Sequence, residues 1–190
     1  MDKNVEQSSN ILGPQSVMAA RDANIYNLPA PRVDAKQLNK LLEKYRHEKA
    51  TNQQFRETIA RLAYYKNYAD NEVRRTLEEK LVAGKRASEV KHALRMKEFF
   101  ARQLLEHELY ESAQDADAYL LGEICTRFNN AVYPSITRSE PEALIAALIE
   151  TQVIAPILQL LSDDDVLAHR REEVFGMIYF LTGNCHINWD

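Results

Sequence analysis

Glycine and proline are scarce in this chain, which has only 5 glycines and 6 prolines among its 190 residues. An all-β fold needs many tight turns, and tight turns favour these two residues, so their scarcity favours helices. Cysteine is scarcer still, because only Cys125 and Cys185 are present and no CxxC pair occurs. Two cysteines without a paired spacing do not indicate a disulfide framework. We therefore expect the protein to reside in a reducing compartment, the cytoplasm.

Long apolar runs are also missing. The N-terminal stretch MDKNVEQSSN is polar and lacks the apolar segment of a signal peptide. No run approaches the roughly 18 apolar residues that span a bilayer, so we expect a soluble protein with no membrane partner. The composition is nevertheless 45% hydrophobic and 27% charged, which is enough for a sizeable core.

Catalytic signatures are absent as well, since the sequence has no P-loop, GxGxxG, HExxH or GxSxG motif. Zinc ligands could come from Cys125, Cys185, His169 and His186, but the one close pair is adjacent, and adjacent side chains diverge. Cys185 also follows a predicted helix C-terminus, where the helix dipole disfavours a thiolate. We therefore expect no enzyme, no metal site and no cofactor.

The N-terminal part divides into two segments. Residues 1–15 are polar and rich in Asn, Gln and Ser, which predicts disorder. Residues 16–33 predict a short β-hairpin arm, SVMAARDANIYN, followed by a proline linker, LPAPR. Because a lone hairpin is marginal in water, we expect Val17, Ile25 and Tyr26 to dock on a partner's sheet edge or to build a homo-oligomer.

The remaining residues, 34–190, carry a helical period and predict an all-α domain of about six or seven helices. The expected helices cover about 34–49, 51–65, 71–83, 88–110, 112–133, 141–161 and 166–181. We expect the fifth helix to end before Pro134 and the sixth to kink or break at Pro156. We expect Leu94 to face the core. We expect Gly183 to adopt the left-handed backbone conformation that commonly follows the last residue of a helix.

Charge is distributed unevenly along the chain. Residues 1–110 carry 20 Lys and Arg against 15 Asp and Glu, whereas residues 111–190 carry 4 against 13. This polarity suits docking on a charged partner, or the pairing of a basic helix with an acidic one within the fold.

The region 74–102 is basic and could bind nucleic acid. Its candidate contacts to the phosphate backbone are Arg74, Arg75, Lys85, Arg86, Lys91 and Arg95. Acidic residues interleave with them and the pI is about 5.8, so nucleic-acid binding is the alternative function.

The last six residues, CHINWD, include the only tryptophan of the sequence. An extended tail there would put Cys185, Ile187 and Trp189 on one face, and His186 and Asn188 on the other. Tryptophan is an effective anchor, so Ile187 and Trp189 either fold back over the core or dock on another chain. The sequence leaves both readings open.

The ending EEVFGMIYFLTGNCHINWD resembles the close of the C-terminal domains of bacterial ABC three-component systems, in which a Gly-Met-aliphatic-aromatic helix leads to a tail with a Trp. The stretches LLEKYRHEKATNQQFRETIARLAYY, LEEKLVAG, EHELYESAQDADAYLLGEI and RFNNAVYPSI are similar too. The likeness covers about 16–190, because SVMAARDANIYN resembles a strand segment placed ahead of such domains. Arg21 there replaces the usual Gly.

This resemblance implies a helical, non-enzymatic adaptor of an antiphage or conflict system. Its expected partners are an SMC-like ATPase, a small middle component, or a separate effector.

Overall fold

The computed structural model describes residues 34–190 except 56, 70–73 and 162–168, and within these ranges the chain forms helices and loops without strands. The first helices are α2 (Lys36–Ala50), α3 (Ala60–Lys66), α4 (Leu77–Ala83), the 3₁₀ turn η1 (Ala87–Glu89) and α5 (Val90–His107). A continuous helix then comprises α6 (Glu111–Arg127), the π segment η2 (Phe128–Val132) and α7 (Tyr133–Thr137). Another comprises α8 (Glu142–Leu148), the π segment η3 (Ile149–Ile154) and α9 (Ala155–Leu160), and α10 (Arg171–Gly183) is last.

The expected all-α class is therefore confirmed for the described residues. The predicted β-hairpin arm, with Val17, Ile25 and Tyr26, lies outside them.

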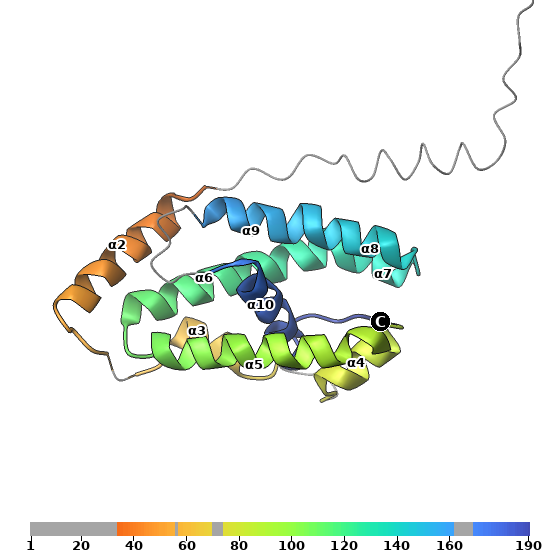
Figure 1. Cartoon of the computed structure of the whole chain (residues 1–190), viewed down its shortest axis with the longest axis horizontal. Helices are drawn as coiled ribbons and strands as arrows, with labels where there is room; N and C mark the ends of the chain where they lie inside the picture. Colours follow the sequence, from red (N-terminus) through yellow and green to blue (C-terminus); the bar gives the residue numbers. More distant parts are fainter. Residues whose placement is uncertain (1–33, 56, 70–73, 162–168) are drawn as a thin grey trace, which may run out of the picture.

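Helix α10 is central to the arrangement, crossing between α5 and the helix formed by α8, η3 and α9 (Figure 1). Its most extensive interface is with α5. Gly176 allows this close crossing, because a Cβ there would lie 2.7 Å from the carbonyl oxygen of Met96 and 2.7 Å from Cβ of Phe100. Any larger residue would push the two helices apart.

One hydrophobic core joins the helices. Leu38 of α2, Leu62 of α3, Phe100 of α5 and Ile187 of the C-terminal tail are fully buried members of the same cluster. Burying an aliphatic or aromatic side chain of this size contributes about 1.5–3 kcal/mol. The early helices α2 and α3 are thus held by the same core as the rest of the chain.

Two prolines lie inside continuous helices, which corrects the expected helix end before Pro134 and the expected break at Pro156. Each proline lies two residues after the last residue of a π segment, η2 before Pro134 and η3 before Pro156. A π segment already interrupts the regular i→i−4 ladder, so the N–H that proline lacks falls where that ladder is broken. The helices therefore continue through both positions.

Three local expectations are also wrong. Thr51 ends α2 instead of starting the next helix, because its hydroxyl donates to the carbonyl of His47 at 2.8 Å, and α3 begins only at Ala60. Leu94 is 46% exposed instead of facing inward. Gly183 is the last residue of α10, and the left-handed position belongs to Cys185, whose φ is 64°.

The helix Glu142–Leu160 is long and apolar enough to cross a membrane by length and composition. This corrects the expectation that no segment reaches that length. More than half of its most apolar window, 56%, is buried inside the chain. A core helix flanked by neighbours on most sides accounts for this composition.

Candidate functional site

The C-terminal tail folds back into the core of its own chain. Trp189 is 2% exposed, and its ring packs edge-on against Phe128 with 5.0 Å between ring centroids. The alternation expected for the tail is confirmed: Cys185, Ile187 and Trp189 are buried, whereas His186 and Asn188 are partly exposed. Ile187 and Trp189 are therefore core residues of this chain, and their docking on another chain stays a prediction.

The end of α4 is shaped to receive this tail. Gly84 follows α4, and a Cβ at this position would lie only 2.5 Å from the carbonyl oxygen of Trp189. The guanidinium of Arg86 lies over the indole of Trp189 at 4.9 Å, a cation–π contact. Arg75 makes a bidentate pair with the carboxylate of Asp190 at 2.6 and 2.8 Å, which holds the pKa of that side chain below its usual value.

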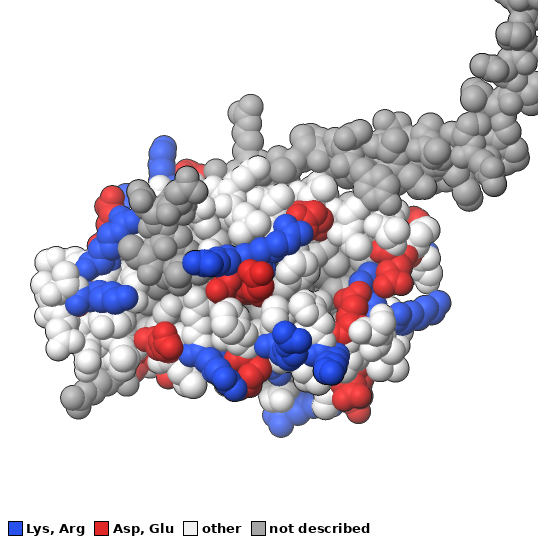
Figure 2. Space-filling model, in the orientation of Figure 1, with Lys and Arg blue, Asp and Glu red and all other residues white. Residues whose placement is uncertain are grey.

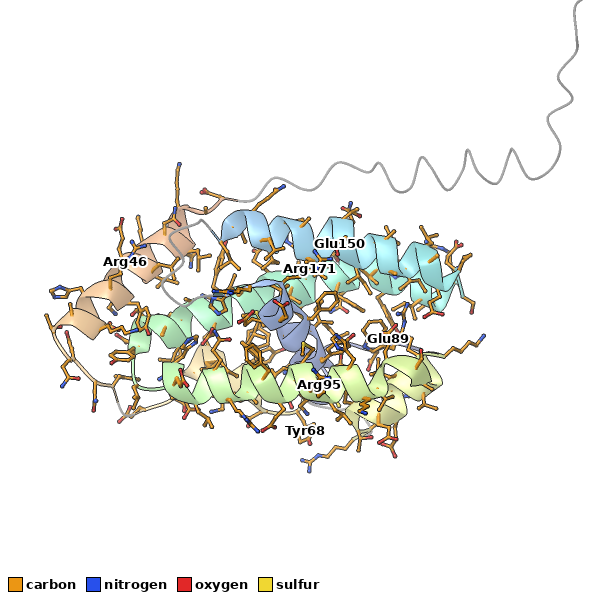
Figure 3. The ribbon with its side chains drawn as sticks, in the orientation of Figure 1. Arg46, Tyr68, Glu89, Arg95, Glu150 and Arg171 are labelled. Atoms are coloured by element: carbon orange, nitrogen blue, oxygen red, sulfur yellow. The ribbon has the colours of Figure 1, made fainter. Side chains whose placement is uncertain are left out.

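A pocket of about 320 Å³ opens beside the tail, between the start of α5 and the α8–η3 helix. Its apolar lining comprises Ala146, Ile149, Phe175, Ile178, Tyr179 and Trp189, and the polar residues Arg86, Glu89, His92 and Glu150 complete it. Figure 3 shows Glu89 at the start of α5 and Glu150 beside Arg171 on the same face. Arg171 pairs with Glu150, and Arg86 pairs with Glu89 at 2.6 Å, so the charges around the pocket nearly cancel.

A second hollow of about 390 Å³ lies on the other side of Arg86 and Trp189, which line both. It is more polar and includes Lys85, Glu140 and Glu142. At the first pocket, burial and the nearby Glu89 carboxylate raise the pKa of Tyr179, so its hydroxyl stays protonated and donates to Glu89 Oε2 at 3.4 Å. The first pocket is thus a largely apolar cavity whose charged and hydroxyl groups are paired with one another.

Three of the six basic residues predicted for nucleic acid make contacts within the chain. Arg86 is buried against Trp189, Arg75 is paired with Asp190, and the guanidinium of Arg74 lies 4.9 Å from the ring of Tyr68. The exposed members of the set are Arg74, Lys85, Lys91 and Arg95. Blue and red side chains interleave across the face drawn in Figure 2, without a continuous positive patch there.

A buried polar cluster lies at the junction of α5, α6 and the segment before α10. His107 Nδ1 is 2.7 Å from Asp117 Oδ2, and His169 Nε2 is 3.2 Å from Asp117 Oδ1. All three residues are buried, and their donor atoms lie within 4.8 Å of one another. Burial opposes ionisation of Asp117 most strongly, but His107 and His169 together outweigh it and hold its pKa below the usual value.

This cluster could not be predicted from the sequence, because the spacing of its three residues matches no recognised metal-binding motif. His107 and Asp117 are separated by the α5–α6 turn, and His169 lies far along the chain. The metal candidates considered from the sequence, Cys125 and Cys185 with His169 and His186, are not the set that the fold assembles. The one available signal was a pair of histidines at predicted helix ends, which is too common to select a site.

Neither cysteine is arranged as an activated nucleophile. Burial raises the pKa of the Cys125 thiol, and a hydrogen bond from Asn129 only partly offsets this effect. The thiol of Cys125 lies 3.5 Å from the carbonyl oxygen of His186 rather than beside an imidazole nitrogen. Cys185 is buried in the tail. Such thiols behave as small apolar side chains rather than reactive groups.

Comparison with protein families gives one assignment. The model of C-terminal domain 9 of the ABC-three component (ABC-3C) systems matches residues 76–189, which contain α4 to α10 and the buried tail. A search of curated proteins found no significant match. A search of solved structures found none either. Because the matched region covers more than half of the chain, the protein belongs to the C-terminal domain 9 family of ABC-3C systems.

Proposed function

We propose that this chain is a non-catalytic adaptor of a bacterial antiphage or conflict system, joining an ATPase or an effector to the rest of the assembly. The match to an ABC-3C domain carries the proposal, because a component of a multi-component system works with other proteins. The two cysteines support it as well, since burial leaves Cys125 unsuited to nucleophilic chemistry.

The docking site in this proposal is the pocket between α5 and the α8–η3 helix. Its volume of about 320 Å³ suits one large apolar side chain, and its walls are mostly aromatic and aliphatic. Interface hot spots are commonly single apolar anchors that enter such pockets. The occupant we propose is an aromatic or leucine side chain of a partner subunit.

Co-expression tests the adaptor role. The tagged chain is produced together with the proteins encoded beside it in its native host, and the purified complex is identified by mass spectrometry and its stoichiometry measured. We expect an ATPase or an effector in stoichiometric amount. Purification of the chain alone, with no such protein encoded nearby, would argue against the proposal.

A matched pair of substitutions tests the pocket. Ala146 and Ala143 are both exposed residues of α8, but only Ala146 lines the pocket. We expect Ala146→Trp to fill the pocket mouth and abolish co-purification, and Ala143→Trp to leave it intact. Equal binding by both variants would place the partner elsewhere.

Gel shifts at several salt concentrations test the alternative, a nucleic-acid-binding regulator that uses the basic region 74–102. We expect no binding at physiological salt, because Arg86 and Arg75 are already paired within the chain. Tight binding that weakens steeply with salt, and that is lost in a Lys91→Glu, Arg95→Glu variant, would instead favour the regulator.

A further inference from the structure

The buried His107–Asp117–His169 cluster supplies three metal-ligating side chains from three separate parts of the fold. His107 is the last residue of α5, Asp117 lies in the second turn of α6, and His169 precedes α10 by two residues. Their side chains are 6%, 0% and 0% exposed. Packing therefore fixes their positions, which is what a preorganised ligand set requires.

The distances between the donor atoms fit a single ion. Zinc binds imidazole nitrogen and carboxylate oxygen at about 2.0–2.2 Å, so neighbouring ligand atoms in a tetrahedral site lie about 3.4 Å apart. The two nitrogens here lie 2.7 and 3.2 Å from the two oxygens of Asp117. Outward shifts of about half an ångström would admit an ion between the two imidazoles and a bidentate carboxylate.

The buried charge of Asp117 also favours a metal ion at this cluster. Asp117 is a completely buried carboxylate, and the partners of its two oxygens are imidazoles rather than Lys or Arg. A buried charge is costly unless a compensating charge or a metal ion accompanies it. Two histidines and one carboxylate form a ligand set of borderline hardness, which suits a divalent transition ion better than calcium or magnesium.

We propose that His107, Asp117 and His169 bind one divalent transition-metal ion of the zinc class. Because the three side chains are closed off from solvent, the ion has a structural role, joining the end of α5, the start of α6 and the entry to α10. This proposal is independent of the adaptor function, since it concerns how the domain is held together and not what it binds.

Metal analysis of the full chain tests the proposal. The protein is purified without a histidine tag, its zinc content is measured by mass spectrometry, and its melting temperature is compared in Zn²⁺ and in EDTA. We expect about one zinc per chain and a melting temperature higher by about 5 °C or more in Zn²⁺. No bound metal, together with equal melting temperatures, would show that hydrogen bonds alone hold the cluster and would overturn the proposal.

Two variants locate the ion. His169→Gln keeps an amide that can donate to Asp117 but provides a much weaker ligand, and His47→Gln alters an exposed histidine of α2. We expect His169→Gln to lose both zinc and the zinc-dependent stabilisation, and His47→Gln to keep them. Zinc retained in His169→Gln would place the ion elsewhere.

A cobalt spectrum keeps the test independent of how the variant folds. Co²⁺ added to the metal-free wild-type chain is expected to produce the visible absorption bands of a four-coordinate site with nitrogen and oxygen ligands. The spectrum of six-coordinate aqueous Co²⁺, unchanged by the protein, would contradict the proposal.

Discussion

The indole N–H of Trp189 donates a hydrogen bond to the hydroxyl of Thr182, seven residues earlier in the last turn of α10, at 3.0 Å. That hydroxyl in turn donates to the carbonyl of Ile178 at 2.9 Å. The tail is therefore tied to the very helix that it follows, through a buried chain of two hydrogen bonds. Buried hydrogen bonds of this kind fix one arrangement because leaving any member unpaired is costly.

Trp189→Ala is expected to destabilise the chain by about 3–5 kcal/mol, because it removes a large buried ring and leaves a cavity against Phe128. Urea unfolding followed by circular dichroism measures the loss. Trp189→Phe is the control: it keeps an aromatic ring and should cost less than the alanine variant. A tail that docks only on a partner would instead show little change in the isolated chain for either variant.

Thr182→Val is expected to cost about 1–3 kcal/mol, because it keeps the side-chain shape but leaves the buried indole N–H without its acceptor. Thr182→Ser retains the hydroxyl and should cost less. The same unfolding assay compares the two. Equal losses would mean that the methyl group of Thr182, and not its hydroxyl, stabilises the tail.

Gly176→Ala is expected to destabilise the α5–α10 interface by about 1–3 kcal/mol, because the added Cβ meets the backbone of Met96 at 2.7 Å. Gly122→Ala is the matched control, since it also lies inside a helix but meets only the end of the Tyr65 side chain, at 3.0 Å. Alanine favours a helix interior over glycine by about 1 kcal/mol, so Gly122→Ala should be neutral or stabilising. If both variants lost similar stability, the close crossing of α5 and α10 would not be the cause of the loss in Gly176→Ala.

Helical periodicity predicted the fold class and most core positions, because a buried face repeats along every helix. Phe100 and Leu104 of α5, and Leu120 and Ile124 of α6, lie four residues apart in each pair and are buried. The helix ends were harder to predict. Prolines 134 and 156 signal helix breaks locally, yet each is accommodated by a preceding π segment, which depends on tertiary packing and leaves no mark in the sequence.

The candidate sites show the same limit. Alternation along the tail correctly predicted which of its side chains are buried, although residues 184–187 form turns and bends and Cys185 has a left-handed φ of 64°. Arg86 looked like a surface cation on sequence grounds, but it is buried by its contacts with Trp189 and Glu89. Those partners come together only in the folded chain, as do His107 and His169 on either side of Asp117.

Asp190→Asn is expected to reduce stability at neutral pH but not in acid. Arg75 lowers the pKa of this carboxyl in the folded state, so the pair stabilises the fold above the unfolded-state pKa of about 3.9. That contribution is lost as the pH falls through the lower, folded-state value. Because both side chains are about one-third exposed, 33% and 36%, the expected difference at pH 7 is below about 1 kcal/mol.

Urea unfolding of the wild type and Asp190→Asn at pH 7 and at pH 2.5 measures this difference directly. Arg75→Gln serves as the reciprocal control, since it removes the other partner of the same ion pair and should show the same pH dependence. High salt should reduce the stability difference between the wild type and Asp190→Asn at pH 7, because the ion pair is partly open to solvent. A stability difference that is equally large at pH 2.5 would mean that Asp190 acts through packing or neutral hydrogen bonds and not through its charge.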